Sequence, residues 1–129
     1  MGDSPAHLKK AALNEELARK LADEEPSKYA DWVITTAFYA AIHCVEAYLF
    51  STPEKHTDGS CPLDGESAMS THDWREQLVD KYKPTASEAY SFLRQSAYVA
   101  RYLCNSVFTG VGAADGIKYM ELVKKECGY

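Results

Sequence analysis

Apolar residues recur every three or four positions along most of the 129-residue chain, which is the spacing of amphipathic helices rather than strands. Near the N-terminus, Leu13, Leu17 and Leu21 follow one another at intervals of four and predict a helix that packs its leucine stripe on a core. A Pro-Ser pair at 26–27 ends this helix and starts a second one, which runs to about residue 50. The apolar positions of the second helix cover more than one face, so we expect it to be the most buried element.

Two capping patterns predict where the next helices begin. Ser70 and Asp73 form a possible capping box for a short third helix that ends near residue 82. Thr85 and Glu88 form a second capping box, which predicts a fourth helix from that point to about residue 108.

Two segments lack the helical spacing. Residues 51–69 are rich in Pro, Gly, Ser and Asp and predict a long connection, of the kind that tends to be functional or mobile inside a compact domain. The stretch "TGVGAADG" (109–116) is interpreted as a glycine-punctuated turn, followed by a short last helix that Asp115 could cap. We find no alternating strand pattern and no internal repeat.

These elements predict an all-α fold, an up-and-down four-helix bundle with a short extra helix. The length fits one domain with one hydrophobic core. Within it we expect an N-terminal helix in residues 1–28, a core in residues 29–108 and a short C-terminal helix in residues 109–129.

Composition and charge narrow the classes of function. The chain is 46% hydrophobic and 26% charged with a net charge of −5, which argues against non-specific nucleic-acid binding through a broad basic face.

The most apolar stretch, "WVITTAFYAAIHCVEAYLF", contains His43 and Glu46, so we interpret it as a core helix rather than a membrane span. The N-terminus lacks the apolar centre of a signal peptide, so we expect a cytoplasmic protein with no membrane association and with reduced cysteines. The histidines and cysteines show no metal-ligand spacing, and no glycine-rich phosphate loop follows a strand, so we expect neither a metal nor a cofactor.

A polar stripe crosses the most apolar helix. Tyr39, His43 and Glu46 are spaced four and three apart and therefore share one helix face. His43 is either a ligand-binding group or a core histidine that bonds to a neighbouring hydroxyl group, and the sequence favours neither.

A second polar stripe lies on the predicted fourth helix, where Arg94, Tyr98, Arg101 and Asn105 are spaced four, three and four apart. Arg94 is interpreted as a solvated edge residue. Arg101 has apolar neighbours in the packing face, so its guanidinium group is expected near the rim of the bundle.

The predicted third helix adds His72 and Arg75, which are three residues apart and project to one side. Such a pair suits an anionic group, because arginine is a fixed donor fork and histidine a titratable donor. The same residues can equally make a helix cap and a surface ion pair with Asp73 or Glu76.

The pattern resembles a HEPN domain of the uncharacterised bacterial and archaeal type. The resemblance covers roughly residues 29–108 and rests on "WVITTAFYAAIHCVEAYL", "HDWR" and "YSFLRQSAYVARY". The residues that carry it are Trp32, Phe38, Tyr39, His43, Glu46, His72, Arg75, Tyr90, Leu93, Ser96, Ala100, Arg101 and Tyr102. It implies a helical bundle, usually a homodimer, often encoded beside nucleotidyltransferases or within defence and toxin–antitoxin systems. Many members cut RNA without a metal, using an arginine followed after four to six residues by a histidine.

This sequence departs from the catalytic pattern of that family. Arg101 is followed by "YLCNSVFTG", and no histidine occurs after His72. Asn105 stands where the histidine is expected, and an amide cannot act as a general base. Catalysis would therefore need a displaced histidine, with Arg101, His72 and His43 as the candidate catalytic residues.

Three hypotheses follow from the sequence. The leading one is a non-catalytic HEPN-like domain that binds RNA, a nucleotide or a partner protein, such as a nucleotidyltransferase-type or antitoxin partner. The second is a metal-independent, toxin-like endoribonuclease, and the third is a structural dimerisation module. The expected ligand-binding cluster comprises Tyr39, His43, His72, Arg75, Ser96 and Arg101.

Overall fold

The computed structural model describes residues 4–54, 70–103 and 108–129, and this part of the chain contains five helices and no strand. The helices are α1 (Ser4–Glu24), α2 (Ala30–Leu49), α3 (Thr71–Tyr82), α4 (Pro84–Tyr102) and α5 (Gly110–Glu126). The predicted all-α fold class is confirmed. Residues 55–69, most of the predicted long connection, lie outside the described residues.

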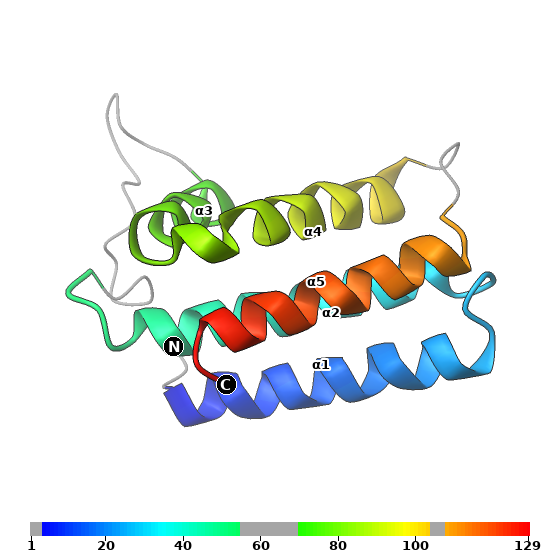
Figure 1. The fold of residues 1–129 in the computed structure, drawn as a ribbon, viewed down its shortest axis with the longest axis horizontal. Helices are drawn as coiled ribbons and strands as arrows, with labels where there is room; N and C mark the ends of the chain where they lie inside the picture. Colours follow the sequence, from blue (N-terminus) through cyan, green and yellow to red (C-terminus); the bar gives the residue numbers. More distant parts are fainter. Residues whose placement is uncertain (1–3, 55–69, 104–107) are drawn as a thin grey trace.

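The four long helices, α1, α2, α4 and α5, run alternately in opposite directions and lie side by side (Figure 1). Helix α2 packs against each of the other three long helices, and α3 packs against α4. The bundle is therefore up-and-down as predicted, but the short extra helix is α3, with 12 residues, rather than the last one, which has 17.

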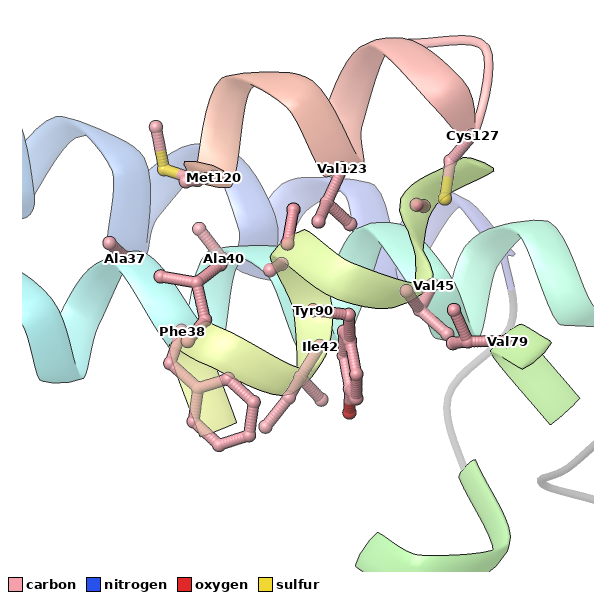
Figure 2. Packing of buried hydrophobic residues seen from close by; sticks show 14 of the residues in the cluster. Ala37, Phe38, Ala40, Ile42, Val45, Val79, Tyr90, Met120, Val123 and Cys127 are labelled. Carbon is pink, nitrogen blue, oxygen red and sulfur yellow. The ribbon is translucent and has the colours of Figure 1, made fainter. Parts of the chain in front are cut away.

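Helix α2 is the central element, as its apolar pattern predicted. Fifteen of its twenty residues are buried. Figure 2 shows Phe38, Ile42 and Val45 of α2 packing with residues from α4 and α5, among them Tyr90 and Val123. In the described part of the chain α2 is also the one helix long and apolar enough to cross a membrane, but 78% of its apolar window is buried inside the bundle, which confirms its interpretation as a core helix.

The leucine stripe predicted for the first helix is wrong in its orientation. Leu13 and Leu17 are 52% and 45% exposed, whereas Ala11 and Ala18 are buried. The small side chains lie on the contact face because they let the backbones of α1 and α2 approach closely. Leu21 alone of the three is partly buried and packs beside the buried Val33.

Helix α4 begins and ends differently from the prediction. It begins at Pro84, and Thr85 caps nothing, because its hydroxyl group pairs with the Glu126 carboxylate at 2.7 Å. It ends at Tyr102 rather than near residue 108, since Leu103 already has an extended conformation. The cap predicted for α3 is confirmed, because Ser70 Oγ accepts a hydrogen bond from the Asp73 amide at 3.1 Å.

The segment 109–116, interpreted from the sequence as a turn, forms the first turns of α5. Its N-cap is Thr109, not Asp115, which lies inside the helix. The glycine at 116 has a packing role: a Cβ there would lie 3.2 Å from Ile34 Cγ1, so glycine lets α5 approach α2. Glycines that a sequence pattern marks as turn residues therefore act here as contact residues.

The described cysteines behave as small apolar residues. Cys44 and Cys127 are free and buried. Burial raises the pKa of the Cys44 thiol to about 11 and that of Cys127 to about 12. Both thiols therefore stay protonated at neutral pH, as expected of structural cysteines.

Candidate functional site

Arg101 lies in the last turn of α4 and is held in place by α2. Its Nε donates a hydrogen bond to the Ala97 carbonyl at 3.1 Å, and its Nη1 donates to the Tyr39 hydroxyl at 2.6 Å. The guanidinium carbon lies 5.6 Å from the ring centre of Tyr39 and 5.2 Å from that of Tyr102. An arginine can therefore stand among apolar neighbours in the sequence, because two tyrosine rings support its guanidinium group at the edge of the core.

Arg101 differs from the other arginines in its charge environment. Arg19, Arg75 and Arg94 each pair with one or two carboxylates. Among the residues that the structure describes, no carboxylate lies within ion-pair distance of Arg101. Its positive charge therefore has no carboxylate partner in this part of the chain, where two of its five N–H donors are engaged, by Ala97 and Tyr39.

A cavity of about 470 Å³ lies beside Arg101, between α3 and α4. Its wall includes Phe38, His72, Glu76, Arg94, Tyr98 and Arg101. Tyr98 is 54% exposed, so the cavity opens to solvent on that side. Arg94 contributes little free charge, because its Nη atoms bind Glu76 and Asp73 at 2.7 Å each.

The protonation of His72 is governed by its burial and by three nearby arginines. Its pKa is lowered by burial first, and then by the positive charges of Arg75, Arg94 and Arg101. The imidazole is therefore neutral at neutral pH. Its Nδ1 lies 3.2 Å from Arg75 Nη1, and arginine can only donate, so Nδ1 is the acceptor and the proton sits on Nε2. His72 can thus offer a neutral N–H donor to a ligand.

Arg75 is buried beneath His72 and belongs to the core. Its Nε binds Glu46 Oε1 at 2.6 Å, and their side chains are only 10% and 3% exposed. Burial alone would lower the pKa of Arg75, but Tyr90 and Glu46 outweigh it, so the pKa is raised and the guanidinium group stays charged. The pKa of Tyr90 is raised to about 12 by its burial, so its phenol stays neutral. Arg75 therefore positions His72 rather than reaching the cavity itself.

A second, smaller cavity of about 230 Å³ lies on the other side of Arg101, between α2 and α4. Asp31, Trp32, Thr35, Tyr39 and Arg101 line it. Thr35 donates its hydroxyl to the Asp31 carbonyl at 2.7 Å, so that group serves its own helix. Arg101 is the residue that contributes to the walls of both cavities.

The structure brings together four of the six residues predicted for the cluster. Arg101 and His72 share a cavity, Tyr39 binds Arg101, and Arg75 supports His72. The other two lie elsewhere. His43 turns toward α1, where its Nδ1 lies 3.0 Å from His7 Nδ1, and Ser96 is buried and lines neither cavity. Asn105 lies outside the described residues.

The sequence reasoning missed the roles of Arg94, Tyr98 and Trp32 in the cavity walls. The stripe of Arg94, Tyr98 and Arg101 was visible in the sequence, but Arg94 was assigned to a solvated edge. Its carboxylate partners lie on α3, and the sequence contains no signal for the packing of α3 on α4 at that point.

The donors of the site, Arg101 and the neutral His72, suit an anion. Within residues 4–54, 70–103 and 108–129, no group of three or more His, Cys, Asp or Glu is placed to hold a metal ion. Comparison of the chain with protein-family models, with curated proteins and with solved structures finds no match. The resemblance to HEPN domains therefore stays a prediction.

Proposed function

We propose that this protein is a non-catalytic, HEPN-like helical domain that binds RNA or a nucleotide, with a phosphate group held at Arg101. The observation that carries the proposal is the guanidinium group of Arg101 at the wall of an open cavity, with no carboxylate partner among the described residues. Arginine binds phosphate oxygens through two parallel N–H donors, and its binding is strongest where the side chain is already held in place. Tyr39 and the Ala97 carbonyl provide that support.

The remaining charges suit one phosphate rather than a long basic track. Arg94 is neutralised by two carboxylates, and the neutral His72 adds a donor without adding a charge. A chain with a net charge of −5 also binds polyanions poorly outside such a site. The geometry therefore favours a short segment or a single nucleotide.

A metal-independent endoribonuclease is the second candidate, because His72 and Arg101 line the same cavity. Cleavage needs a general base within reach of the attacking 2′-hydroxyl group. The unprotonated nitrogen of His72 is Nδ1, which accepts a hydrogen bond from Arg75. The nitrogen left for a ligand carries the proton, and this arrangement supports binding more than catalysis.

The partner and location expected from the resemblance belong to the same proposal. Exposed Leu13 and Leu17 on one face of α1 support association with a second copy or another protein. A homodimer, a nucleotidyltransferase-type or antitoxin partner and a cytoplasmic location are proposed on the resemblance alone.

The test measures binding of labelled single-stranded RNA and of nucleoside monophosphates in EDTA, for the native protein and for Arg101→Gln. We expect Arg101→Gln to weaken binding at least about tenfold, the effect of losing one charge-assisted hydrogen-bonded contact, and to reduce the salt dependence. Lys118→Gln is the matched control, because it removes one positive charge at an exposed position on α5.

Three other results would contradict the proposal. Equal affinity in both variants would exclude Arg101 as the phosphate site. Cleavage of the RNA that Arg101→Gln abolishes would favour the endoribonuclease. A large loss of thermal stability without ligand binding by the native protein would favour a structural role for Arg101.

A further inference from the structure

Arg101 lines two cavities, and each also has an exposed aromatic side chain in its wall. Tyr98 borders the larger cavity and is 54% exposed, and Trp32 borders the smaller one and is 60% exposed. The two aromatic residues come from different helices, α4 and α2, so their placement on either side of one arginine is a property of the fold.

Aromatic residues at such positions offer their faces to planar ligands. The ring of Tyr98 lies 5.1 Å from that of Tyr102, which supports it from one turn further along α4. Stacking on an aromatic side chain is available to every nucleobase, since each has a π-face, and is the usual way in which proteins hold unpaired bases.

The acidic residues of the two cavities show where a phosphate would be disfavoured. Glu76 lies in the wall of the larger cavity and Asp31 in that of the smaller one. A carboxylate repels phosphate but accepts hydrogen bonds from the exocyclic amino groups of bases. Arg94 in the larger cavity is already paired with Glu76 and Asp73, so the positive charge without a carboxylate partner in the described part of the chain is that of Arg101. Each cavity combines an aromatic side chain with a carboxylate.

We propose that the site takes two successive nucleotides of a single-stranded nucleic acid. The linking phosphate binds Arg101, one base stacks on Tyr98 in the larger cavity, and the next base stacks on Trp32 in the smaller one. This inference rests on the proposed function, since it assigns the phosphate to the same arginine, and it adds the number of bases and the residues that hold them.

The experiment compares three ligands: inorganic phosphate, a nucleoside monophosphate and a dinucleotide with one linking phosphate. Binding is measured by calorimetry and by quenching of tryptophan fluorescence, for the native protein and for Trp32→Ala, Tyr98→Ala and Arg101→Gln. Leu122→Ala is the matched control, because Leu122 is a 41% exposed apolar residue on α5 and lines neither cavity.

We expect Trp32→Ala and Tyr98→Ala each to weaken dinucleotide binding about fivefold to a hundredfold, the range measured for the loss of one stacked base. The affinity for inorganic phosphate should stay unchanged in these two variants and fall in Arg101→Gln. Dinucleotide should quench the fluorescence of the native protein and of Tyr98→Ala, but not that of Trp32→Ala.

The outcomes that overturn the inference differ from those that overturn the proposed function. Native-like dinucleotide affinity in both Trp32→Ala and Tyr98→Ala would exclude the two-base site while leaving the phosphate site at Arg101 intact. If no ligand binds in an Arg101-dependent way, both proposals fail. If the aromatic variants instead shift the sedimentation coefficient of the free protein and leave the dinucleotide affinity unchanged, the surface is an interface with a second copy of the chain.

Discussion

Arg101 and Tyr39 join the end of α4 to the middle of α2 through a hydrogen bond of 2.6 Å from Nη1 to the phenol oxygen. The same tyrosine ring also lies 5.6 Å from the guanidinium carbon. A charged group at the edge of the core is thus held by one aromatic residue in two ways, through its hydroxyl group and through its π-face. The aliphatic part of Arg101 can remain in the packing face while its charge reaches the cavities.

Replacing Tyr39 by Phe tests how much the hydroxyl group contributes. The ring and its packing remain, so we expect the free energy of unfolding to fall by only about 0.5–1.5 kcal/mol, the net value of one hydrogen bond. Ligand affinity should fall as well, because the guanidinium group loses its fixed orientation. Urea denaturation measures the first effect, and titration with a nucleoside monophosphate measures the second.

The control for this experiment is Tyr102→Phe. Tyr102 also lies beside Arg101 but has no hydrogen bond to it through its hydroxyl group in the described part of the structure. Equal losses of affinity in the two variants would show that the bond from Arg101 to Tyr39 does not orient the arginine.

The buried pair of Arg75 and Glu46 should behave as a unit. Replacing Arg75 by Met leaves a carboxylate in a side chain that is only 3% exposed, so we expect a loss of about 3–5 kcal/mol in the free energy of unfolding. The double variant Arg75→Met with Glu46→Leu should recover most of that loss, because no buried charge is left unpaired.

Arg94→Met is the matched comparison, since this arginine of α4 also pairs with carboxylates. Its partners lie on α3, and its side chain is more exposed than that of Arg75. It should cost no more than about 1 kcal/mol. If Arg75→Met costs as little as Arg94→Met, the pair does not stabilise the packing of α3 against the bundle.

The fold class and the central helix could be predicted because they depend on hydrophobic spacing alone. Helix α2 is apolar on nearly all sides, and only a central position in a bundle satisfies such a pattern. The face of α1 that packs against α2 could not be predicted in this way. Its leucines suggested one buried face, whereas the contact with α2 uses Ala11 and Ala18, where close approach of the backbones matters more than side-chain area.

The site was predictable in part for a similar reason. Arg101 and Tyr39 stood out because each is a polar group beside apolar neighbours in the sequence. Such a signal is local and needs no knowledge of other helices. Arg94 looks like a solvated edge residue in the sequence, and Trp32 carries the resemblance without any signal for a cavity wall. The place of both residues beside Arg101 depends on contacts between different helices. His43 carried the same local signal as Tyr39, yet it faces His7 of α1.

The close approach of α5 to α2 at the glycine in position 116 can be tested with a larger residue. A Cβ at this position would already lie 3.2 Å from Ile34 Cγ1 and 3.6 Å from Ile34 Cα. Gly116→Val adds two further methyl groups, so we expect a loss of about 1–3 kcal/mol, the usual cost of overpacking, measured by urea denaturation. Ala114→Val, at an exposed position of the same helix, controls for helix propensity and should cost much less. Helix propensity alone favours valine over glycine, so a loss in Gly116→Val no larger than that in Ala114→Val would show that the contact with Ile34 does not cause overpacking.

Two of the partly buried histidines, His43 and His72, should make the fold less stable in mild acid. The pKa of His43 is lowered by burial and by the charges of His7 and Arg75, and Glu46 opposes this shift only in part. The pKa of His72 is lowered by burial and by three arginines. In the unfolded chain both groups titrate near the ordinary value of about 6.5, so below that pH the unfolded state binds protons that the folded state does not. The free energy of unfolding should be constant above about pH 7.5. It should then fall between pH 6.5 and 5 with a slope of at most about 1.4 kcal/mol per pH unit for each histidine.

Carboxylates such as Glu15 and Asp73, whose pKa values are also lowered, contribute only at lower pH, because their ordinary values are 4.5 and 3.8. Urea denaturation of the native protein at a series of pH values measures the slope, and His43→Gln and His72→Gln should each reduce it. A slope that persists in the double variant His43→Gln with His72→Gln would show that other groups cause the acid sensitivity.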